Sequence, residues 1–165
     1  MSLAKQLGSA FFLSACFCLS FALVGCGPIG PLSGRTLAGP VHSQPVEDWS
    51  FVAAQETCQV ETNPAEPHSV NTWCLGDGAR LYVPSSMIRG PKLPSERAWV
   101  RNVLADPRLR IRIGDEVYER TAVRVTDAAE YDTARAALEK KYGLDPADRD
   151  PEREIWIFRL DPRIF

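Results

Sequence analysis

Five cysteines and two histidines have the widest chemical repertoire in this chain. The chain has no Cys-x-x-Cys motif, and His42 and His68 both lie in loop-like stretches, so nothing predicts a metal site. Residues 49–62 and 69–83 read as strands around a turn-rich segment, 63–68. Cys58 and Cys74 are equidistant from the turn centre, so an antiparallel hairpin would place them opposite each other. We predict a structural disulfide between them; two free buried thiols, or a redox-active or metal-binding pair, are the alternatives.

Other catalytic constellations are weak. The sequence has no Ser/His/Asp set that points to a triad, and it has no G-x-x-x-x-G-K-[ST] phosphate loop. His68 is a candidate general base, or simply an exposed turn residue. The row Arg108, Arg110 and Arg112 could bind an anionic ligand or a lipid headgroup, or could form the wet face of a strand.

The N-terminal residues predict where in the cell the protein is located. Leu23-Val24-Gly25-Cys26 closes an uncharged apolar run, 7–24, which follows a start whose only charge is Lys5. This order is typical of a secretory signal, and a cysteine after Leu-x-Gly resembles the bacterial lipoprotein signal. The resemblance implies that 1–25 is a signal peptide and that Cys26 carries lipid, including palmitate. An uncleaved transmembrane anchor is the alternative, because about 18 apolar residues just span a bilayer.

The rest of the chain fits a protein of the bacterial cell envelope. Removing residues 1–25 leaves one domain's worth of chain in a compartment that permits disulfides. Lys5 is the only charge lost, so the net charge moves from −2 to −3, which gives no electrostatic sign of a nucleic-acid partner. Gly27 after the cysteine is not an acidic retention signal, which favours the periplasmic face of the outer membrane.

The domain boundaries follow from composition. Residues 26–47 are rich in proline and glycine with little periodicity, so we expect a flexible tether. The folded domain is expected over 48–165. Its predicted strands, after allowance for a turn at Gly76-Asp77-Gly78, are 49–62, 70–75, 80–83, 108–113, 116–125 and 154–160.

Two helices complete the predicted domain. Ser95 is the expected N-cap of the first helix, which Asp106-Pro107 ends. Thr126 or Asp127 is expected to cap the second, 128–142, which Gly143 ends. An apolar stripe of this helix should pack on the sheet: Tyr131, Ala134, Leu138 and Tyr142. Counting outward from the turn at Gly114-Asp115 pairs Arg110 with Glu119 across a hairpin.

Three stretches carry a family resemblance: 81–86, 98–107 and 109–118. The sequence Leu-Tyr-Val-Pro-Ser-Ser, then Trp99 with Asn102 before Asp-Pro, then the Ile-Gly hairpin with Tyr118, resembles the deazaflavin-dependent nitroreductase family. That family belongs to a wider split β-barrel group, which includes flavin-binding pyridoxamine-phosphate oxidases. The resemblance implies a mainly β, α+β fold, namely a six-stranded antiparallel split β-barrel with two flanking helices. It also implies a cleft for FMN or a deazaflavin, and a homodimer.

Carried over residue by residue, the resemblance implies cofactor contacts from the loop after the Leu-Tyr-Val strand and from the following helix. The candidates are Ser85, Ser86, Arg89, Lys92, Trp99 and Asn102. Hydroxyl and cationic groups ahead of a helix suit an anion. The alternatives are a solvated loop and, for Trp99, a place in the core.

One departure from the family bears on function. Relatives carry a Gly-Arg-x-Ser-Gly-like phosphate cradle where this chain has Asn63-Pro64-Ala65-Glu66-Pro67-His68; its prolines lack N–H donors and Glu66 would repel phosphate. We therefore predict a membrane-anchored envelope lipoprotein whose barrel binds a small ligand or partner, with or without catalysis. The alternative is a flavin- or deazaflavin-dependent oxidoreductase of the nitroreductase or quinone-reductase type, so the sequence leaves enzymatic activity open.

Overall fold

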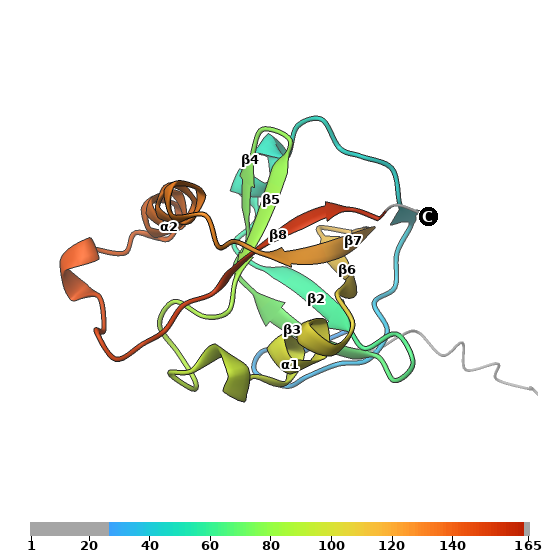
Figure 1. Ribbon diagram of the computed structural model, residues 1–165. Coiled ribbons are helices and arrows are strands. Elements are labelled where there is room, and N and C mark those ends of the chain that lie inside the picture. The colour runs from blue at the N-terminus through green and yellow to red at the C-terminus, as the bar shows by residue number, and fades with distance from the viewer. Residues whose placement is uncertain (1–26, 164–165) are drawn as a thin grey trace, which may run out of the picture.

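The structure, a computed structural model that describes residues 27–163, is a curled sheet with two helices (Figure 1). Its strands are β1 (Val41–His42), β2 (Cys58–Thr62), β3 (His68–Thr72), β4 (Leu75–Asp77), β5 (Arg80–Pro84), β6 (Arg108–Ile113), β7 (Glu116–Arg124) and β8 (Ile157–Pro162). The helices are α1 (Ala98–Ala105) and α2 (Ala128–Tyr142), with short 3-10 turns η1 (Ser50–Ala54), η2 (Pro94–Glu96) and η3 (Pro146–Asp148). None of the helices in 27–163 has the length and apolar content needed to cross a membrane. The predicted signal peptide and Cys26 lie outside the described residues.

The order of the strands forces the sheet to curl. The order is β3-β2-β6-β7-β8-β5-β4 with antiparallel neighbours, and β1 pairs with β7 in parallel. β3 and β4 lie at opposite ends of this order, yet only Trp73 and Cys74 separate them in the chain. So short a connection spans at most about 11 Å. The two end strands therefore meet, and we call this meeting point the seam.

The predicted fold class is confirmed: the sheet is mostly antiparallel and the class is α+β. The sheet has eight strands rather than the six expected. One extra strand arises because the predicted strand 70–75 breaks at Trp73-Cys74 into β3 and β4, and β1 comes from the predicted tether. Residues 50–54 were expected to be extended but form η1 instead. Just before η1, the Trp49 N–H donates to the Gly78 carbonyl at 2.7 Å.

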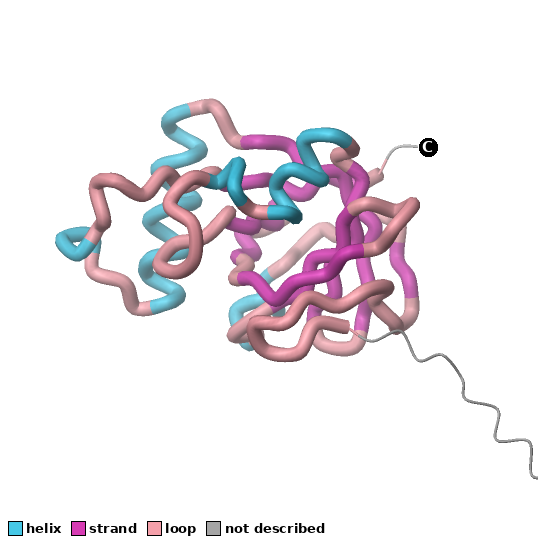
Figure 2. Tube along the Cα trace, turned by 90° about the horizontal axis from the view of Figure 1, so that it is seen from below, coloured by secondary structure: helices cyan, strands magenta, loops and turns pink. Residues whose placement is uncertain are grey.

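Two apolar clusters fill the fold. The first joins the strands, η1 and α1, and its members include Val52, Val60, Leu81, Trp99, Val100 and Ile111. The second joins the sheet to α2 through Tyr82, Ile157, Ala134 and Leu138. Tyr131 and Tyr142 pack against this second cluster, so the predicted stripe of α2 is confirmed. The helices accordingly lie around the strands rather than among them (Figure 2).

Local signals at the hairpin and at α2 are confirmed. Arg110 pairs with Glu119 in the β6–β7 ladder, and the turn between the strands uses Gly114 at φ 61°. Asp127 caps α2 by accepting a hydrogen bond from the Glu130 N–H, and Gly143 ends the helix in the left-handed region. The predicted end of α1 at Asp106 is confirmed, but the predicted N-cap is wrong: Ser95 lies inside η2, and Arg97 precedes the helix without a side-chain cap.

The disulfide Cys58–Cys74 is present, but its strand register differs from the prediction. Cys58 pairs with Thr72, and Cys74 lies just beyond β3, with 6.1 Å between the two cysteine Cα atoms. The hairpin is centred one residue earlier than expected because Asn63 enters the turn in the left-handed region, at φ 57°. The disulfide therefore joins β2 to the seam rather than bridging opposed residues of one hairpin.

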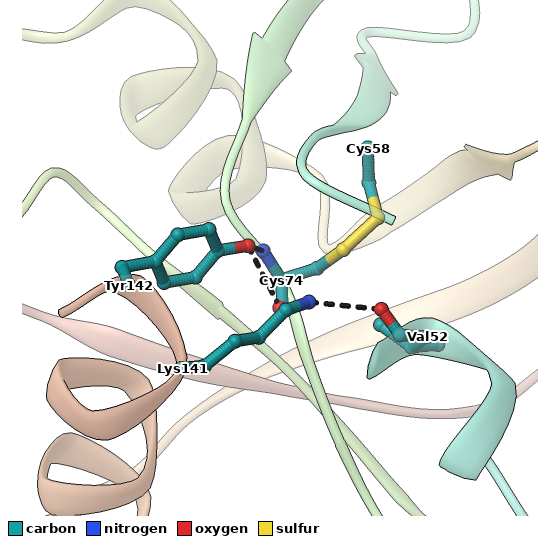
Figure 3. Close-up of a disulfide and its surroundings, with 5 residues drawn as sticks. All are labelled: Val52, Cys58, Cys74, Lys141 and Tyr142. Atoms are coloured by element: carbon teal, nitrogen blue, oxygen red, sulfur yellow. Dashed lines mark hydrogen bonds between the residues drawn. A yellow bond between two sulfur atoms is a disulfide. The ribbon is translucent and has the colours of Figure 1, made fainter. Parts of the chain in front are cut away.

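The last turn of α2 also holds the seam (Figure 3). The Lys141 ammonium donates to the carbonyls of Val52 and Cys74, at 2.9 and 2.7 Å. The Tyr142 hydroxyl accepts from the Cys74 N–H at 2.9 Å and lies 3.0 Å from the Cys74 carbonyl. Burial lowers the pKa of Lys141 and raises that of Tyr142. Helix, disulfide and η1 thus converge on Cys74.

Residues 27–47, expected to be a flexible tether, instead pack along the barrel, and we call them the N-terminal strap. Figure 1 shows this segment running from beside β3 up the side of the barrel toward η1. Leu37 is 1% exposed, and its N–H donates to the buried Glu61 carboxylate. Gly34 bridges to Ser69 of β3. The folded part therefore begins at least as early as residue 27 rather than at 48, because a buried leucine and backbone hydrogen bonds outweigh the proline- and glycine-rich composition.

The seam predicts a stability cost for losing the disulfide. We expect the Cys58→Ser/Cys74→Ser variant to lose about 3 kcal/mol of unfolding free energy, the value for closing a loop of this length. Urea unfolding in oxidising buffer would measure the loss. The wild type should lose a similar amount when a thiol reductant is added, and the variant should not respond. Equal stabilities for variant and oxidised wild type would contradict a bond that holds the seam.

Candidate functional site

Two loops meet below α2 and enclose the best candidate site. One loop, 85–94, follows β5, and the other, 143–155, follows α2; in Figure 1 they run close together at the lower left. The Glu154 N–H donates to the Lys92 carbonyl at 3.1 Å. The Lys92 ammonium contacts Glu152 and also lies 3.3 Å from Asp150. The hydrogen bond to Glu152 is the main cause that raises the pKa of Lys92.

Two arginines hold the turn of the first loop by hydrogen bonds to its backbone carbonyls. The Arg153 side chain, 10% exposed, reaches the carbonyls of Arg89, Gly90 and Pro91 at 3.1 to 3.4 Å. Arg97 donates to the Arg89 carbonyl as well. Burial lowers the pKa of the Arg97 guanidinium, and the neighbouring Arg153 charge lowers it further. Carbonyl oxygens thus hold two guanidinium groups close together.

A cavity of about 230 Å³ lies between the two loops and α2, and we call it the cleft. Four apolar side chains form part of its wall: Met87, Ile88, Leu144 and Ile155. The charged part is supplied by Arg135, Glu139, Asp145, Asp148, Arg149, Asp150 and Arg153. Small-molecule sites are usually lined mainly by apolar groups, so this cleft is more highly charged than most.

Glu139 organises the charged side of the cleft. Its side chain is 5% exposed, and it accepts from Arg135 at 3.1 Å and from Arg149 at 2.8 and 2.7 Å. The Arg149 hydrogen bond is the largest cause that lowers the pKa of Glu139, and Glu139 in turn raises the pKa of Arg149. The carboxylate therefore stays ionised and holds both guanidinium groups at the cleft.

The serines predicted for cofactor binding serve the loop itself. Ser85 is 4% exposed; its N–H donates to the Trp156 carbonyl at 2.7 Å, and its hydroxyl accepts from the Trp156 N–H at 3.0 Å. The Ser86 hydroxyl donates to the Arg89 carbonyl at 2.6 Å and closes the next turn. Both residues flank the cleft, where they set the path of the loop.

The predicted cations lie beside the cleft rather than in its wall. Arg89 follows the lining residue Ile88, and Lys92 is engaged with Asp150 and Glu152. The turn between Ser86 and Arg89 presents the Met87 and Ile88 side chains to the cleft.

The two α1 candidates lie elsewhere. Trp99 is 5% exposed and packs edge-on against Phe158 at a ring distance of 5.4 Å, within the first apolar cluster. Asn102 donates to the Thr62 hydroxyl at 2.9 Å, so it braces the hairpin whose turn departs from the family pattern. The structure thus groups Ser85, Ser86, Arg89 and Lys92 around the cleft and separates Trp99 and Asn102 from them.

Sequence reasoning missed Met87, Ile88, Glu139 and Arg153, which line the cleft, and Arg97, which holds the turn of the first loop. Glu139 alone carried a local signal, because Arg135 precedes it by four residues on a helix. The stretch 143–153 reads only as a polar loop, and its approach to 85–94 depends on where β8 enters the sheet. Among the described residues, no cluster of histidine, cysteine and acidic groups could hold a metal ion.

A second hollow, of about 340 Å³, lies on the other side of α2. Two of its polar groups pair with each other: the Tyr82 hydroxyl donates to Glu130 at 2.9 Å, and Arg159 binds the same carboxylate at 2.9 and 3.0 Å. Apart from Tyr82, its apolar lining consists of two alanines, Ala129 and Ala134, so it offers less apolar surface than the cleft and is the weaker candidate.

Comparison with known proteins bears on the cleft. The family model for F420H(2)-dependent quinone reductase matches residues 66–160, more than half of the chain. A solved F420-H2 dependent reductase is similar at 18% identity, with a TM-score of 0.54 over 65% of this chain and 95% of that one. A putative pyridoxamine 5'-phosphate oxidase from Listeria innocua is similar at 16% identity, with a TM-score of 0.50 over 70% of this chain and 90% of that one. No curated protein matches the chain.

A third solved structure, described as a domain-swapped dimer, is 18% identical, with a TM-score of 0.53 over 65% of this chain and 81% of that one. At these identities the solved structures support the fold alone. The split-barrel neighbours agree with the fold expected from the sequence.

The arginine pair around Glu139 predicts a pH dependence of stability. We expect Glu139→Gln to lose about 1–3 kcal/mol of unfolding free energy at neutral pH, because a buried charge-assisted pair is broken. The folded-state pKa of Glu139 is lowered, so its stabilisation is present above the ordinary glutamate pKa and is lost as the pH falls through the folded value. The difference between wild type and variant should therefore shrink on acidification, as followed by urea unfolding at several pH values.

Glu152→Gln is the control for this prediction. Its side chain is 76% exposed and also contacts a cation, so the change should stay within about 0.5 kcal/mol at every pH. A gap between wild type and Glu139→Gln that does not change with pH would show that the charge of Glu139 is not what stabilises the fold.

Proposed function

The chain belongs to the F420H(2)-dependent quinone reductase family, and from this premise we propose that it is an oxidoreductase that uses a deazaflavin to reduce a quinone-like acceptor in the cleft. The observation that carries the proposal is the extent of the family match. Residues 66–160 contain both loops, 85–94 and 143–155, that enclose the cleft. Of the two readings that the sequence left open, this supports the oxidoreductase better than a purely binding role, and it supports a deazaflavin more specifically than FMN.

The residues at the cleft suit such a coenzyme. Met87, Ile88 and Ile155 offer an apolar surface for a flat ring system. Arg97 and Arg153 place two guanidinium groups at the adjoining turn, which also contains Arg89, so an anionic tail would be attracted there. About 230 Å³ is less than the 300–1,000 Å³ usual for ligand pockets, so a whole coenzyme has to extend beyond the cleft.

The chain's own groups supply binding and electrostatics. A reduced deazaflavin, when bound, supplies a hydride. Arg135 and Arg149 lie at the cleft with their positions set by Glu139, so they can stabilise negative charge on an acceptor's carbonyl oxygen. Asp145, Asp148 and Asp150 also line the cleft and disfavour anionic acceptors. A neutral quinone or nitro compound is therefore the expected acceptor class.

Attachment to the cell envelope is the second part of the proposal. The signal-like run 7–24 and Cys26 support a lipid-anchored protein, with the periplasmic face of the outer membrane favoured. Intact-mass spectrometry of the membrane-extracted protein would detect cleavage before Cys26 and the added lipid. A soluble, unmodified full-length chain would contradict the anchor.

A homodimer is also proposed, and the similar solved structure described as a domain-swapped dimer supports it. Light scattering of the purified full-length protein in detergent should give twice the mass of one chain after correction for bound detergent. A monomeric mass across the accessible concentration range would contradict the dimer.

The decisive measurement for the enzyme is turnover. Purified protein, reduced deazaflavin coenzyme and a water-soluble naphthoquinone should together restore the absorbance of the oxidised coenzyme, and omission of any component should abolish it. Ile88→Asp should weaken coenzyme binding about tenfold or more, because it replaces an apolar wall with a negative charge.

Leu104→Asp is the matched control. Leu104 of α1 is 55% exposed and Ile88 is 48% exposed, so both variants place an acid at a similarly accessible aliphatic position. Only Ile88 lines the cleft. Equal effects of the two substitutions would place the site elsewhere, and coenzyme binding without turnover would return the protein to a binding role.

A further inference from the structure

Ile29 and Leu32 are the most exposed large hydrophobic side chains of the described residues, at 75% and 69%. They face solvent from the two ends of one tight turn, in which each backbone N–H donates to the carbonyl of the other residue, at 3.2 and 3.0 Å. Gly30 between them takes φ 54°. The turn therefore presents two aliphatic side chains together rather than singly.

The barrel holds this turn in place. Asn71 of β3 donates to the Gly30 carbonyl at 2.8 Å, and Gln59 of β2 donates to the Pro28 carbonyl at 3.3 Å. Gln59 and Asn71 also bond each other at 3.1 Å. After the turn, Gly34 pairs with Ser69 through two backbone hydrogen bonds. Exposed aliphatic groups that are fastened in this way cannot fold back onto the core.

The chain that precedes the turn leads directly to the proposed anchor. Ile29 is three residues after Cys26, a separation of at most about 11 Å. There is also little slack, because Pro28 is buried and a Cβ added at Gly27 would lie 3.0 Å from the Gln59 side-chain oxygen. A lipid on Cys26, or an uncleaved apolar run 7–24, would in either case bring a bilayer within reach of Ile29 and Leu32.

The charge around the turn agrees with a lipid surface. Arg35 is exposed three residues after Leu32, and the Arg112 guanidinium lies 3.7 Å from the position of that added Cβ at Gly27. Cationic groups beside an apolar tip can contact headgroup phosphates while the tip enters the acyl boundary.

We propose that the Ile29–Leu32 turn is a membrane-docking tip that inserts into the phospholipid interface beside the anchor and sets the orientation of the barrel on the bilayer. The proposal rests on the proposed membrane attachment, and it is independent of the reductase activity. Anchor and tip provide two membrane contacts at one corner of the domain, so the barrel lies directly on the surface rather than at the end of a tether.

Photocrosslinking in vesicles tests the tip. The full-length gene product carrying Leu32→p-benzoylphenylalanine is purified from membranes and reconstituted into vesicles of phosphatidylethanolamine and phosphatidylglycerol. The vesicles are then irradiated, and lipid adducts of the protein are detected by mass spectrometry. Leu104→p-benzoylphenylalanine is the control, at another exposed leucine on α1. We expect about tenfold or more lipid adduct at position 32 relative to position 104, the ratio given by burial of one aliphatic side chain.

The outcomes separate docking from attachment. Membrane-bound protein with similar lipid adducts at both positions overturns docking and leaves attachment standing. Adducts at position 32 to a second copy of the chain, or to another protein, identify a protein interface and also overturn docking. Full-length protein that stays outside the vesicles overturns attachment and docking together. Turnover is not the readout, so failure of the reductase proposal changes none of these results.

Discussion

Closure of the sheet at the seam is the constraint on which the rest of the structure depends. Its two end strands are consecutive in the chain, so β3 and β4 must meet, and the Cys58–Cys74 disulfide ties that meeting point to β2. Trp49, which precedes η1, packs so closely on β4 that a Cβ added at Gly76 would lie 2.0 Å from the Trp49 carbonyl oxygen. The Tyr142 ring stacks on Trp73 at 4.0 Å, which brings the end of α2 onto the same point. Barrel closure and the placement of α2 thus depend on contacts at the same point.

The cleft is a consequence of that placement. Because α2 ends at the seam, the chain must travel from Gly143 back to β8, and it passes the loop that leaves β5. The two loops are then joined by ionic contacts and by guanidinium groups on carbonyls, while Met87 and Ile88 face inward. The cleft in which we propose the cofactor chemistry therefore has charged groups, Arg135, Glu139 and Arg149, that belong partly to the helix that closes the barrel.

The opposite end of the molecule carries the proposed link to the membrane. The N-terminal strap is held by Glu61, Arg110 and Ser69, residues that face it from the sheet. Its composition alone suggested a flexible segment, since proline and glycine are common in linkers. Packing overrode composition because one buried side chain, Leu37, and a series of backbone hydrogen bonds offset the entropy of ordering the segment.

The sequence by itself determined what depends on near neighbours: the β6–β7 register with Arg110 opposite Glu119, and both ends of α2. The α+β class followed from the family resemblance, and the pairing of Cys58 with Cys74 was predicted correctly although the hairpin register that suggested it was one residue off. Periodicity, caps and turn glycines act over a few residues, so they can be read directly from the chain. The tertiary structure alone decided the eighth strand, the packing of the strap, the core position of Trp99 and the approach of 143–155 to 85–94. Each of these depends on contacts between segments far apart in the chain, whose free energy appears only once the barrel has closed.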